Sequence, residues 1–204
     1  MTLTHFAIIA VCAYLLGSLS FAIIVSKLTL GKDIRNYGSG NAGLTNAYRT
    51  MGAKKTLLVL LGDIAKGAAA VSIGMVLAGP VGKLTAGIFV ILGHMFPLYF
   101  GFKGGKGVLV GAVMLVFFDW RVFGIAFLLF VLAVALTKWI SLGSILGAIS
   151  FPITTWVFYR DPVLTAMAFG MAAVVVFMHR SNIGRIIRGK ENKFSFKSKK
   201  TMSD

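Results

Sequence analysis

Long apolar runs follow one another along the chain, and short polar connectors separate them. A helix that crosses the hydrocarbon core of a bilayer needs about 20 mostly apolar residues, and fewer where it starts in a protein-lined recess. The pattern therefore predicts an all-α integral membrane protein with seven transmembrane helices, the fourth of which is short. The predicted spans cover residues 5–29, 56–79, 83–100, 107–118, 122–137, 140–159 and 163–179.

The fourth and fifth runs allow a second interpretation, in which residues 107–137 form one re-entrant hairpin and five true spans remain. Either count is odd, so we expect the two termini on opposite sides of the membrane. Basic connectors favour the cytoplasmic side. With the N-terminus outside, all but four of the 21 Lys and Arg residues fall in cytoplasmic connectors or in the C-terminal tail. The sequence thus predicts an outside N-terminus and a cytoplasmic C-terminus.

The composition agrees with a membrane protein. Only 13% of the residues are charged, whereas a soluble domain carries about 25%. The formal charge of +15 lies in short connectors and in the tail, which suits anionic headgroups or phosphorylated substrates better than nucleic acid. We expect one transmembrane domain over residues 1–183, a basic cytoplasmic tail over 184–204 and no nucleic-acid partner.

The chain has few of the cysteine and acidic residues that redox and metal chemistry require. Cys12 is the only cysteine, so no intramolecular disulfide or cysteine-ligated zinc site can form. The whole chain has six Asp and Glu residues, which leaves no acidic cluster for magnesium. We therefore expect no metal and no cofactor. The first residues lack the basic segment of a cleavable signal peptide and are predicted to stay as the first span.

The first of three polar stretches covers residues 36–49, directly after an apolar run. Its glycines allow backbone N–H groups to converge on an anion, and an arginine can hold a phosphate with two parallel hydrogen bonds. The alternative is that its polar side chains only cap the following helix. The candidate ligands of a phosphate here are Ser39, Asn41, Gly43, Thr45, Asn46 and Arg49.

The second stretch covers residues 101–108 and resembles a Walker phosphate loop only superficially. Its spacing is one residue short, and Gly107 stands where such a loop has serine or threonine. Flexible amides and two lysines at the start of a helix near Val108 still predict an anion pocket. The alternative is a glycine linker whose lysines bind headgroups. The candidate ligands are Lys103, Gly104, Gly105, Lys106 and Gly107.

The third stretch covers residues 179–183 and opens the basic tail. His179 and Asn182 are spaced i and i+3, so they share one face at a helix end. Such a histidine alone is more often structural. With two predicted anion pockets on the same side of the membrane, both residues become candidates for the site.

Two ionisable residues lie inside the second predicted span. Asp63 and Lys66 are spaced i and i+3, so they are expected to neutralise each other, and Lys66 could also reach a phosphate. In the third span, a bend and a buried hydrogen bond explain Pro97 and His94 without a functional role.

The motifs together resemble those of the bacterial acyl-phosphate:glycerol-3-phosphate acyltransferases. The similar runs are GSGNAGLTN with Arg49, GFKGGKGV preceded by GHMFP, and HRSNI, and they are accompanied by LLGSLSFA and GDIAKG. The resemblance implies transfer of an acyl chain from acyl phosphate to glycerol 3-phosphate. The products would be 1-acylglycerol 3-phosphate and inorganic phosphate, in the first acylation of phospholipid synthesis. It also implies a seven-span bundle in the bacterial cytoplasmic membrane, with the site at the cytoplasmic face.

The resemblance also implies roles for single residues. Ser39 and Arg49 would bind a substrate phosphate, and residues 104–107 with Lys106 would hold the second phosphate. His179 and Asn182 would position the substrate. The expected partners are glycerol 3-phosphate, acyl phosphate, the lipid bilayer and an enzyme that produces acyl phosphate. The resemblance departs at Ser181, where the family usually has glutamate.

Such a site must hold two phosphates and accept the proton of the glycerol hydroxyl. His179 is the only histidine in a motif and is one candidate base. The other candidate is an oxygen of a substrate phosphate, and we favour it slightly, since positioning alone can lower much of the barrier.

Two other classes of protein fit part of the sequence. A transporter or flippase also points helix ends at anions, but no inverted repeat is visible and the polar stretches lie on one side of the membrane. A scaffold that binds anionic lipid would need only the tail. We predict that this tail is flexible, with Phe194 and Phe196 near the interface, and that deletion after Lys190 leaves catalysis largely intact.

Overall fold

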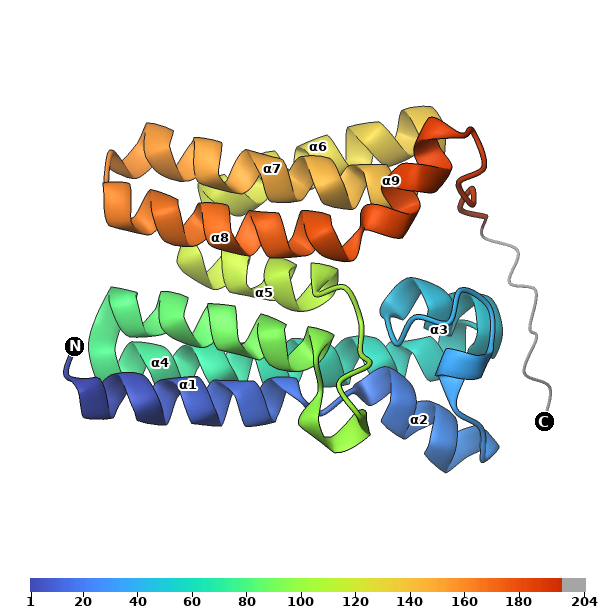
Figure 1. Cartoon of the computed structure of the whole chain (residues 1–204), viewed down its shortest axis with the longest axis horizontal. Coiled ribbons are helices and arrows are strands. Elements are labelled where there is room, and N and C mark those ends of the chain that lie inside the picture. Colours follow the sequence, from blue (N-terminus) through green and yellow to red (C-terminus); the bar gives the residue numbers. More distant parts are fainter. Residues whose placement is uncertain (196–204) are drawn as a thin grey trace. The chain divides into compact units, whose positions relative to one another are not determined.

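The computed structural model describes residues 1–195, so Phe196 and the residues after it lie outside the described part of the chain. All regular elements in the described part are helices, which confirms the all-α prediction (Figure 1). The chain forms two compact units, which are described separately below. Unit 1 covers Met1–Phe118, and unit 2 begins at Asp119.

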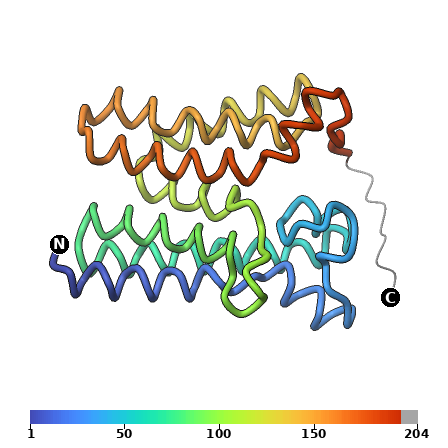
Figure 2. Tube along the Cα trace, viewed as in Figure 1, coloured from blue at the N-terminus to red at the C-terminus, as the bar shows by residue number. Residues whose placement is uncertain are grey.

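The first predicted span is a helix with a break in it. Helix α1 covers Leu3–Gly17 and helix α2 covers Phe21–Leu30, and the trace in Figure 2 changes direction between them. Helix α1 packs against helix α4 (Ala53–Met95). A Cβ atom at Gly17 would lie 2.2 Å from the carbonyl oxygen of Val90, so this close approach requires glycine.

Helix α4 contains two predicted spans, 56–79 and 83–100, folded against each other. The backbone leaves the helical region at Ala78 and Gly79, where the φ of Gly79 is +59°, and Pro80 follows. A Cβ atom at Gly74 would lie 2.3 Å from the carbonyl oxygen of Gly82. Residues eight apart in a straight helix are about 12 Å apart along its axis, so α4 must reverse its direction here.

The remaining elements of unit 1 carry the first two polar stretches. A 3-10 turn, η1 (Ile34–Asn36), and a short helix, α3 (Leu44–Met51), flank the first stretch. A second 3-10 turn, η2 (Leu98–Phe100), leads into the second stretch, and helix α5 (Val108–Phe118) follows it. The helix predicted to begin near Val108 is therefore confirmed.

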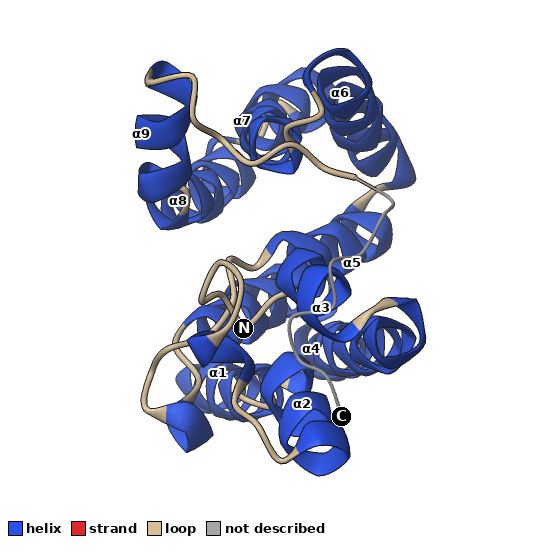
Figure 3. Ribbon diagram, turned by 90° about the vertical axis from the view of Figure 1, so that its right-hand side faces the viewer, coloured by secondary structure: helices blue, strands red, loops and turns tan. Residues whose placement is uncertain are grey.

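In the part of unit 2 that the structure describes there are four helices, α6 (Trp120–Thr137), α7 (Ile140–Tyr159), α8 (Pro162–Met178) and α9 (Arg180–Ile187). Asp119 and Asp161 cap α6 and α8 through hydrogen bonds from backbone N–H groups to their side chains. Helix α9 is bent by 60° relative to α8 and extends into the predicted tail. Figure 3 shows that the two helices run in different directions. The predicted spans in unit 2 match α6, α7 and α8 within a few residues.

Several helices are long and apolar enough to cross a membrane, which supports the prediction of a multi-pass membrane protein. Four described helical segments meet that condition, or five if α8 with α9 is one span. One of the four runs from Ala53 to Phe100 and includes both halves of α4. Helix α5 is apolar but shorter. The count of seven spans stays a prediction.

Candidate functional site

The first stretch is held in shape by one buried amide, that of Asn46. Its side chain is 2% exposed. The oxygen Oδ1 accepts a hydrogen bond from Ser39 N at 2.9 Å, and Nδ2 donates to the carbonyl oxygen of Tyr37 at 3.0 Å. A Cβ atom at Gly38, where φ is +60°, would lie 2.3 Å from Oδ1. Asn46, predicted as a ligand, is thus engaged in fixing the loop.

The other candidates of the first stretch lie around this loop. Ser39 is exposed, and Asn41, Gly43, Thr45 and Arg49 are half-buried. Helix α3 has Gly43 as its N-cap and receives no hydrogen bond from a capping side chain. The N-cap position therefore gives no support to the alternative that these polar side chains only cap the helix.

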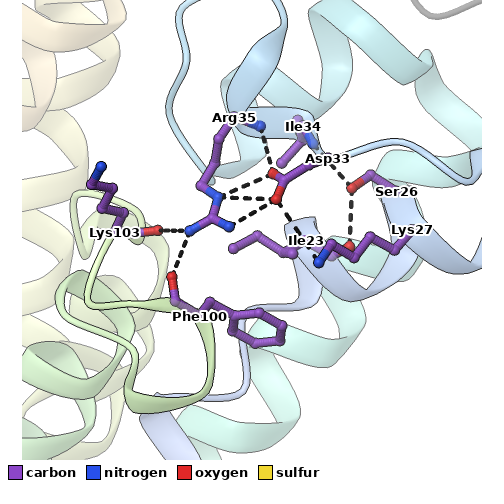
Figure 4. Close-up of polar contacts among 8 residues, drawn as sticks. All are labelled: Ile23, Ser26, Lys27, Asp33, Ile34, Arg35, Phe100 and Lys103. Atoms are coloured by element: carbon purple, nitrogen blue, oxygen red, sulfur yellow. Dashed lines mark hydrogen bonds and ion pairs between the residues drawn. The ribbon is translucent and has the colours of Figure 1, made fainter.

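Arg35 ties the first stretch to the second. Its guanidinium donates to the carbonyl oxygens of Phe100 at 2.6 Å and Lys103 at 3.2 Å, and also to the carboxylate of Asp33 (Figure 4). These hydrogen bonds from Arg35 hold the pKa of the Asp33 carboxyl below its usual range. The sequence does not mark Arg35 as part of the site, because its carbonyl partners lie about 65 residues away along the chain.

The second stretch is fastened to the end of α4 by its backbone. Gly104 N donates to the carbonyl oxygen of Met95, and Gly105 N donates to that of His94, both at 3.1 Å. A Cβ atom at Gly104 would lie 2.1 Å from the His94 carbonyl oxygen. These two glycines therefore serve close packing, and their amides are already engaged, which corrects their predicted role as phosphate donors.

The next candidates in this stretch lie one residue further on. Lys106 is half-buried, and Gly107 has a φ of +76° directly before α5. The N–H groups in the first turn of an α-helix have no partner within that helix and attract anions. Lys106, Gly107 and the start of α5 therefore form the better candidate phosphate pocket.

The first two stretches meet in unit 1. A Cβ atom at Gly105 would lie 2.9 Å from the carbonyl oxygen of Ala42, which belongs to the first stretch. Together with the bonds from Arg35, this contact brings two basic, glycine-rich segments side by side.

A buried charged cluster in unit 1 is formed by Asp63, Lys66 and His94. Lys66 Nζ is 2.8 Å from Asp63 Oδ1, which confirms the predicted neutralisation, and 3.1 Å from His94 Nδ1. Nζ also donates to the carbonyl oxygens of Gly17 at 3.1 Å and Leu19 at 2.7 Å, at the break between α1 and α2. The Lys66 ammonium is thus enclosed by protein atoms, and we interpret it as a structural cation.

The third stretch belongs to unit 2, where His179 joins α8 to α9. Its Nδ1 lies 2.8 Å from the carbonyl oxygen of Val175. A carbonyl only accepts, so Nδ1 carries the proton, and Nε2 is the accepting nitrogen of the neutral ring. This tautomer suits both predicted roles of His179, as a base and as a positioning residue.

Asn182 is oriented by a residue from the predicted tail. Its Nδ2 donates to Glu191 Oε1 at 2.7 Å, and Glu191 also accepts from Ser141 at 2.9 Å and Arg185 at 2.7 Å. Partial burial would raise the pKa of Glu191, but these hydrogen bonds outweigh it and lower that pKa. With Phe194 N bonded to the Lys138 carbonyl oxygen at 2.7 Å, the prediction of a flexible tail is wrong for these residues.

A family model described as glycerol-3-phosphate acyltransferase matches residues 7–189. The chain belongs to this acyltransferase family. A relative named glycerol-3-phosphate acyltransferase 2, from Bacillus anthracis, is 40% identical over 183 residues, which is 90% of this chain and 96% of the relative. A glycerol-3-phosphate acyltransferase of Thermoanaerobacter sp. (strain X514) is 42% identical over 192 residues, or 93% and 96% of the two chains.

Solved structures of the acyltransferase PlsY share the fold. PlsY is an integral membrane glycerol 3-phosphate acyltransferase, and its glycerol 3-phosphate form aligns with a TM-score of 0.87 and 34% identity. That alignment covers 93% of this chain and 96% of PlsY. Its lysophosphatidic acid form aligns with a TM-score of 0.84 and 32% identity, over 94% and 96% of the two chains. The resemblance inferred from the motifs is confirmed, and the protein is a membrane acyltransferase.

Glu191, like Arg35, contacts the candidate site residues but was not among the residues predicted from the sequence. One signal was available, because Glu191 is the only acidic residue between Asp161 and Asp204. A lone carboxylate in a strongly basic segment needs a specific partner more than another solvated charge does. Within residues 1–195, no group of three His, Cys, Asp or Glu side chains is arranged to hold a metal ion.

Proposed function

We propose that this acyltransferase moves an acyl chain from an acyl phosphate to a hydroxyl of glycerol 3-phosphate. The products are 1-acylglycerol 3-phosphate and inorganic phosphate. The observation that carries the proposal is the junction of the first two stretches in unit 1, made by Arg35 and by the Ala42–Gly105 approach. Two basic segments at one place suit a reaction in which both substrates carry phosphate. Solved forms of PlsY with glycerol 3-phosphate and lysophosphatidic acid support the acceptor and the product.

The bond changes follow from the substrates. The glycerol hydroxyl oxygen attacks the carbonyl carbon of the acyl phosphate, and the bond from that carbon to the bridging oxygen breaks. Phosphate leaves with the electron pair of that bond. Ser39 and Arg49 bind the phosphate of glycerol 3-phosphate. Lys106, Gly107 and the first turn of α5 stabilise the charge that develops on the departing phosphate.

The hydroxyl proton goes to a phosphate oxygen in the route that we favour, and His179 then only orients the acceptor together with Asn182. The alternative gives the proton to His179 Nε2. Replacing His179 by Gln separates the two routes. Substantial residual kcat with an unchanged pH profile excludes His179 as the base.

The charge distribution supports the placement of the reaction. An outside N-terminus puts the first two stretches and the C-terminal segment on the cytoplasmic side of a bacterial cytoplasmic membrane. The proposal includes seven spans and a single transmembrane domain over residues 1–183, with a basic segment after it. An enzyme that makes acyl phosphate is the expected upstream partner, since the donor must be supplied in activated form.

The test is phosphate release by purified protein given palmitoyl phosphate, with and without glycerol 3-phosphate. We expect release that requires the acceptor and that falls at least about 100-fold in Lys106→Ala. Lys54→Ala, which changes an exposed lysine at the start of α4, is the matched control and should keep full activity. If the folded wild type releases no phosphate, the proposal is wrong, and uptake of glycerol 3-phosphate into vesicles would then test the transporter alternative.

A further inference from the structure

We infer that Arg35 is a positioning residue for acyl transfer, because its guanidinium holds a strained turn at Gly101 and Phe102 that opens the second stretch. This role rests on the proposed function and adds Arg35, Asp33 and the turn to the site. It is the same whichever substrate phosphate the second stretch binds, since the turn places the whole stretch.

The turn at the start of the second stretch has an unfavourable backbone conformation. Gly101 and Phe102 both have positive φ angles, +67° and +58°. Glycine adopts this region freely, but a bulky residue such as phenylalanine does so rarely and at a steric cost. Within residues 1–195, the other non-glycine residues with positive φ are Lys138 and Arg160, and each is the C-cap of an α-helix. Phe102 does not end an α-helix, so other contacts must hold it.

Arg35 holds the turn at both of its ends. Its Nη1 group donates to the carbonyl oxygen of Phe100 at 2.6 Å, just before the turn, and to that of Lys103 at 3.2 Å, just after it (Figure 4). Inside the turn, Phe102 N donates to the carbonyl oxygen of Pro97 at 2.9 Å. Backbone strain persists only where the surrounding structure enforces it. The two bonds from Arg35 supply that constraint, because they fix the carbonyls on either side of the strained residues.

Asp33 fixes the direction of the Arg35 guanidinium. Its carboxylate accepts hydrogen bonds from Nε of Arg35 at 3.0 Å and from Nη2 at 2.8 Å. With the two bonds to backbone carbonyls, these contacts occupy at least four of the five N–H groups of an arginine. The carboxylate also offsets the charge of the guanidinium. Arg35 is therefore arranged to place the turn and not to bind a substrate phosphate directly.

The turn determines where the rest of the second stretch lies. Directly after Lys103, the backbone N–H groups of Gly104 and Gly105 donate to carbonyl oxygens at the end of α4. These bonds can form only while the chain leaves Lys103 in one direction. A turn that relaxed to negative φ at Phe102 would change this direction and would carry Lys106 away from its position.

Three possible roles of Arg35 give different results. A purely structural residue would lower stability when replaced, while each folded molecule kept its activity. A residue that acts through its positive charge would be replaced well by lysine. A positioning residue would lose activity in either substitution with little change in stability, because an ammonium lacks the planar fork that reaches the carboxylate and both carbonyls at once.

The kinetic test compares the full-length wild type with Arg35→Gln and Arg35→Lys in the phosphate-release assay. In both variants we expect kcat/KM to fall at least about tenfold, whichever substrate is varied, and Tm to change by less than about 4 °C. Arg188→Gln, which changes an exposed arginine directly after α9, is the matched control and should keep full activity. Full activity in Arg35→Lys, or a loss of activity only in proportion to unfolded protein, would overturn the inference.

A second substitution tests the strain itself. Asparagine tolerates positive φ better than most other residues with a side chain. Phe102 is 54% exposed, so Phe102→Asn removes little buried contact. We expect Phe102→Asn to raise the activity of Arg35→Gln by about threefold or more, and to give a smaller gain in the wild type, where Arg35 already holds the turn. The same factor in both backgrounds would contradict the inference.

Hydrogen exchange gives a measurement that does not depend on catalysis. The backbone N–H groups of Phe102, Gly104 and Gly105 are hydrogen-bonded in the folded protein. In detergent, we expect peptides from residues 98–107 of the full-length protein to exchange about fivefold faster in Arg35→Gln than in the wild type. Phe102→Asn should reverse part of that increase. Unchanged exchange would contradict the inference. If the wild type fails the phosphate-release assay while the exchange results hold, the proposed function fails and the control of the turn by Arg35 stands.

Discussion

A carboxylate lies next to each of the second and third polar stretches, but the two carboxylates act in different ways. In unit 1, the glycine loop of the second stretch rests on backbone hydrogen bonds and on a buried ion cluster built from residues within the helices. In unit 2, Asn182 of the third stretch is held by one carboxylate from a segment after the last helix. The first support is part of the fold, so its loss should unfold the unit. The second is a side-chain contact, so its loss should mainly affect activity.

The largest effect is expected when the ion cluster loses its anion. Asp63→Asn leaves the Lys66 ammonium buried without an opposite charge, which should cost roughly 3–5 kcal/mol of stability. Thermal denaturation in detergent measures this loss. Asp63→Asn combined with Lys66→Met removes both charges and should be milder. A single variant as stable as the wild type would show that the pair is not needed for the fold.

Loss of the Glu191 carboxylate should come next in size. Hydrogen bonds to a charged group contribute about 1.5–3 kcal/mol, so Glu191→Ala should reduce kcat by roughly tenfold to a hundredfold while the protein stays folded. Truncation after Lys190 should have the same effect, and truncation after Ser195 is the control. Full activity after truncation at Lys190 would contradict this role of Glu191 and would agree with the prediction from the sequence that the tail is not needed for catalysis.

The first stretch should respond to the loss of its central amide. Asn46→Ala removes the bonds to Ser39 N and to the Tyr37 carbonyl oxygen, which should destabilise the loop by roughly 1–3 kcal/mol. The KM for glycerol 3-phosphate should rise more than the KM for acyl phosphate. Asn36→Ala, an exposed position in the same stretch, is the comparison and should leave both values unchanged.

The smallest effect concerns the partly exposed Asp33–Arg35 pair. Because Arg35 lowers the pKa of Asp33 in the folded state, the pair stabilises the protein above the ordinary pKa of 3.8. That contribution disappears as the pH falls through the lower folded value. It should amount to less than about 1 kcal/mol. Denaturation followed from about pH 6 to about pH 3 should show a shallower pH dependence in Asp33→Asn than in the wild type. An identical slope would contradict this.

The positions of most helices were predictable because the length of an apolar run is a local property, but the break after Gly17 was not. Residues 18–20 read Ser-Leu-Ser and contain no glycine or proline. The break is stabilised by Lys66, 49 and 47 residues away from the carbonyls of Gly17 and Leu19 to which it donates. The turn inside α4 was predicted more accurately, because Gly79 and Pro80 mark it in the sequence.

The motifs that form the candidate site were predictable from the sequence, but the roles of single residues within them were less so. A glycine-rich run looks the same whether its amides bind an anion or pack against a helix, so Gly104 and Gly105 received the wrong role. Asn46 was identified, but its hydrogen bonds hold the loop. The bonds from Arg35 to the second stretch could not be read from the sequence, because the partners are distant along the chain. Glu191 has one distant partner, Ser141, 50 residues away, and two nearby ones, Asn182 and Arg185, that an irregular segment brings within reach.

The hydrogen bonds from Lys66 to the α1–α2 break also bear on the order in which the first two helical segments reach their final form during biosynthesis. The carbonyls of Gly17 and Leu19 are translated 49 and 47 residues before Lys66, and in lipid each unsatisfied carbonyl costs several kcal/mol. The N-terminal segment can therefore enter the bilayer first only as an unbroken helix or stay near its surface. It reaches its broken form when the next helix brings the ammonium alongside, so the two must mature as a pair.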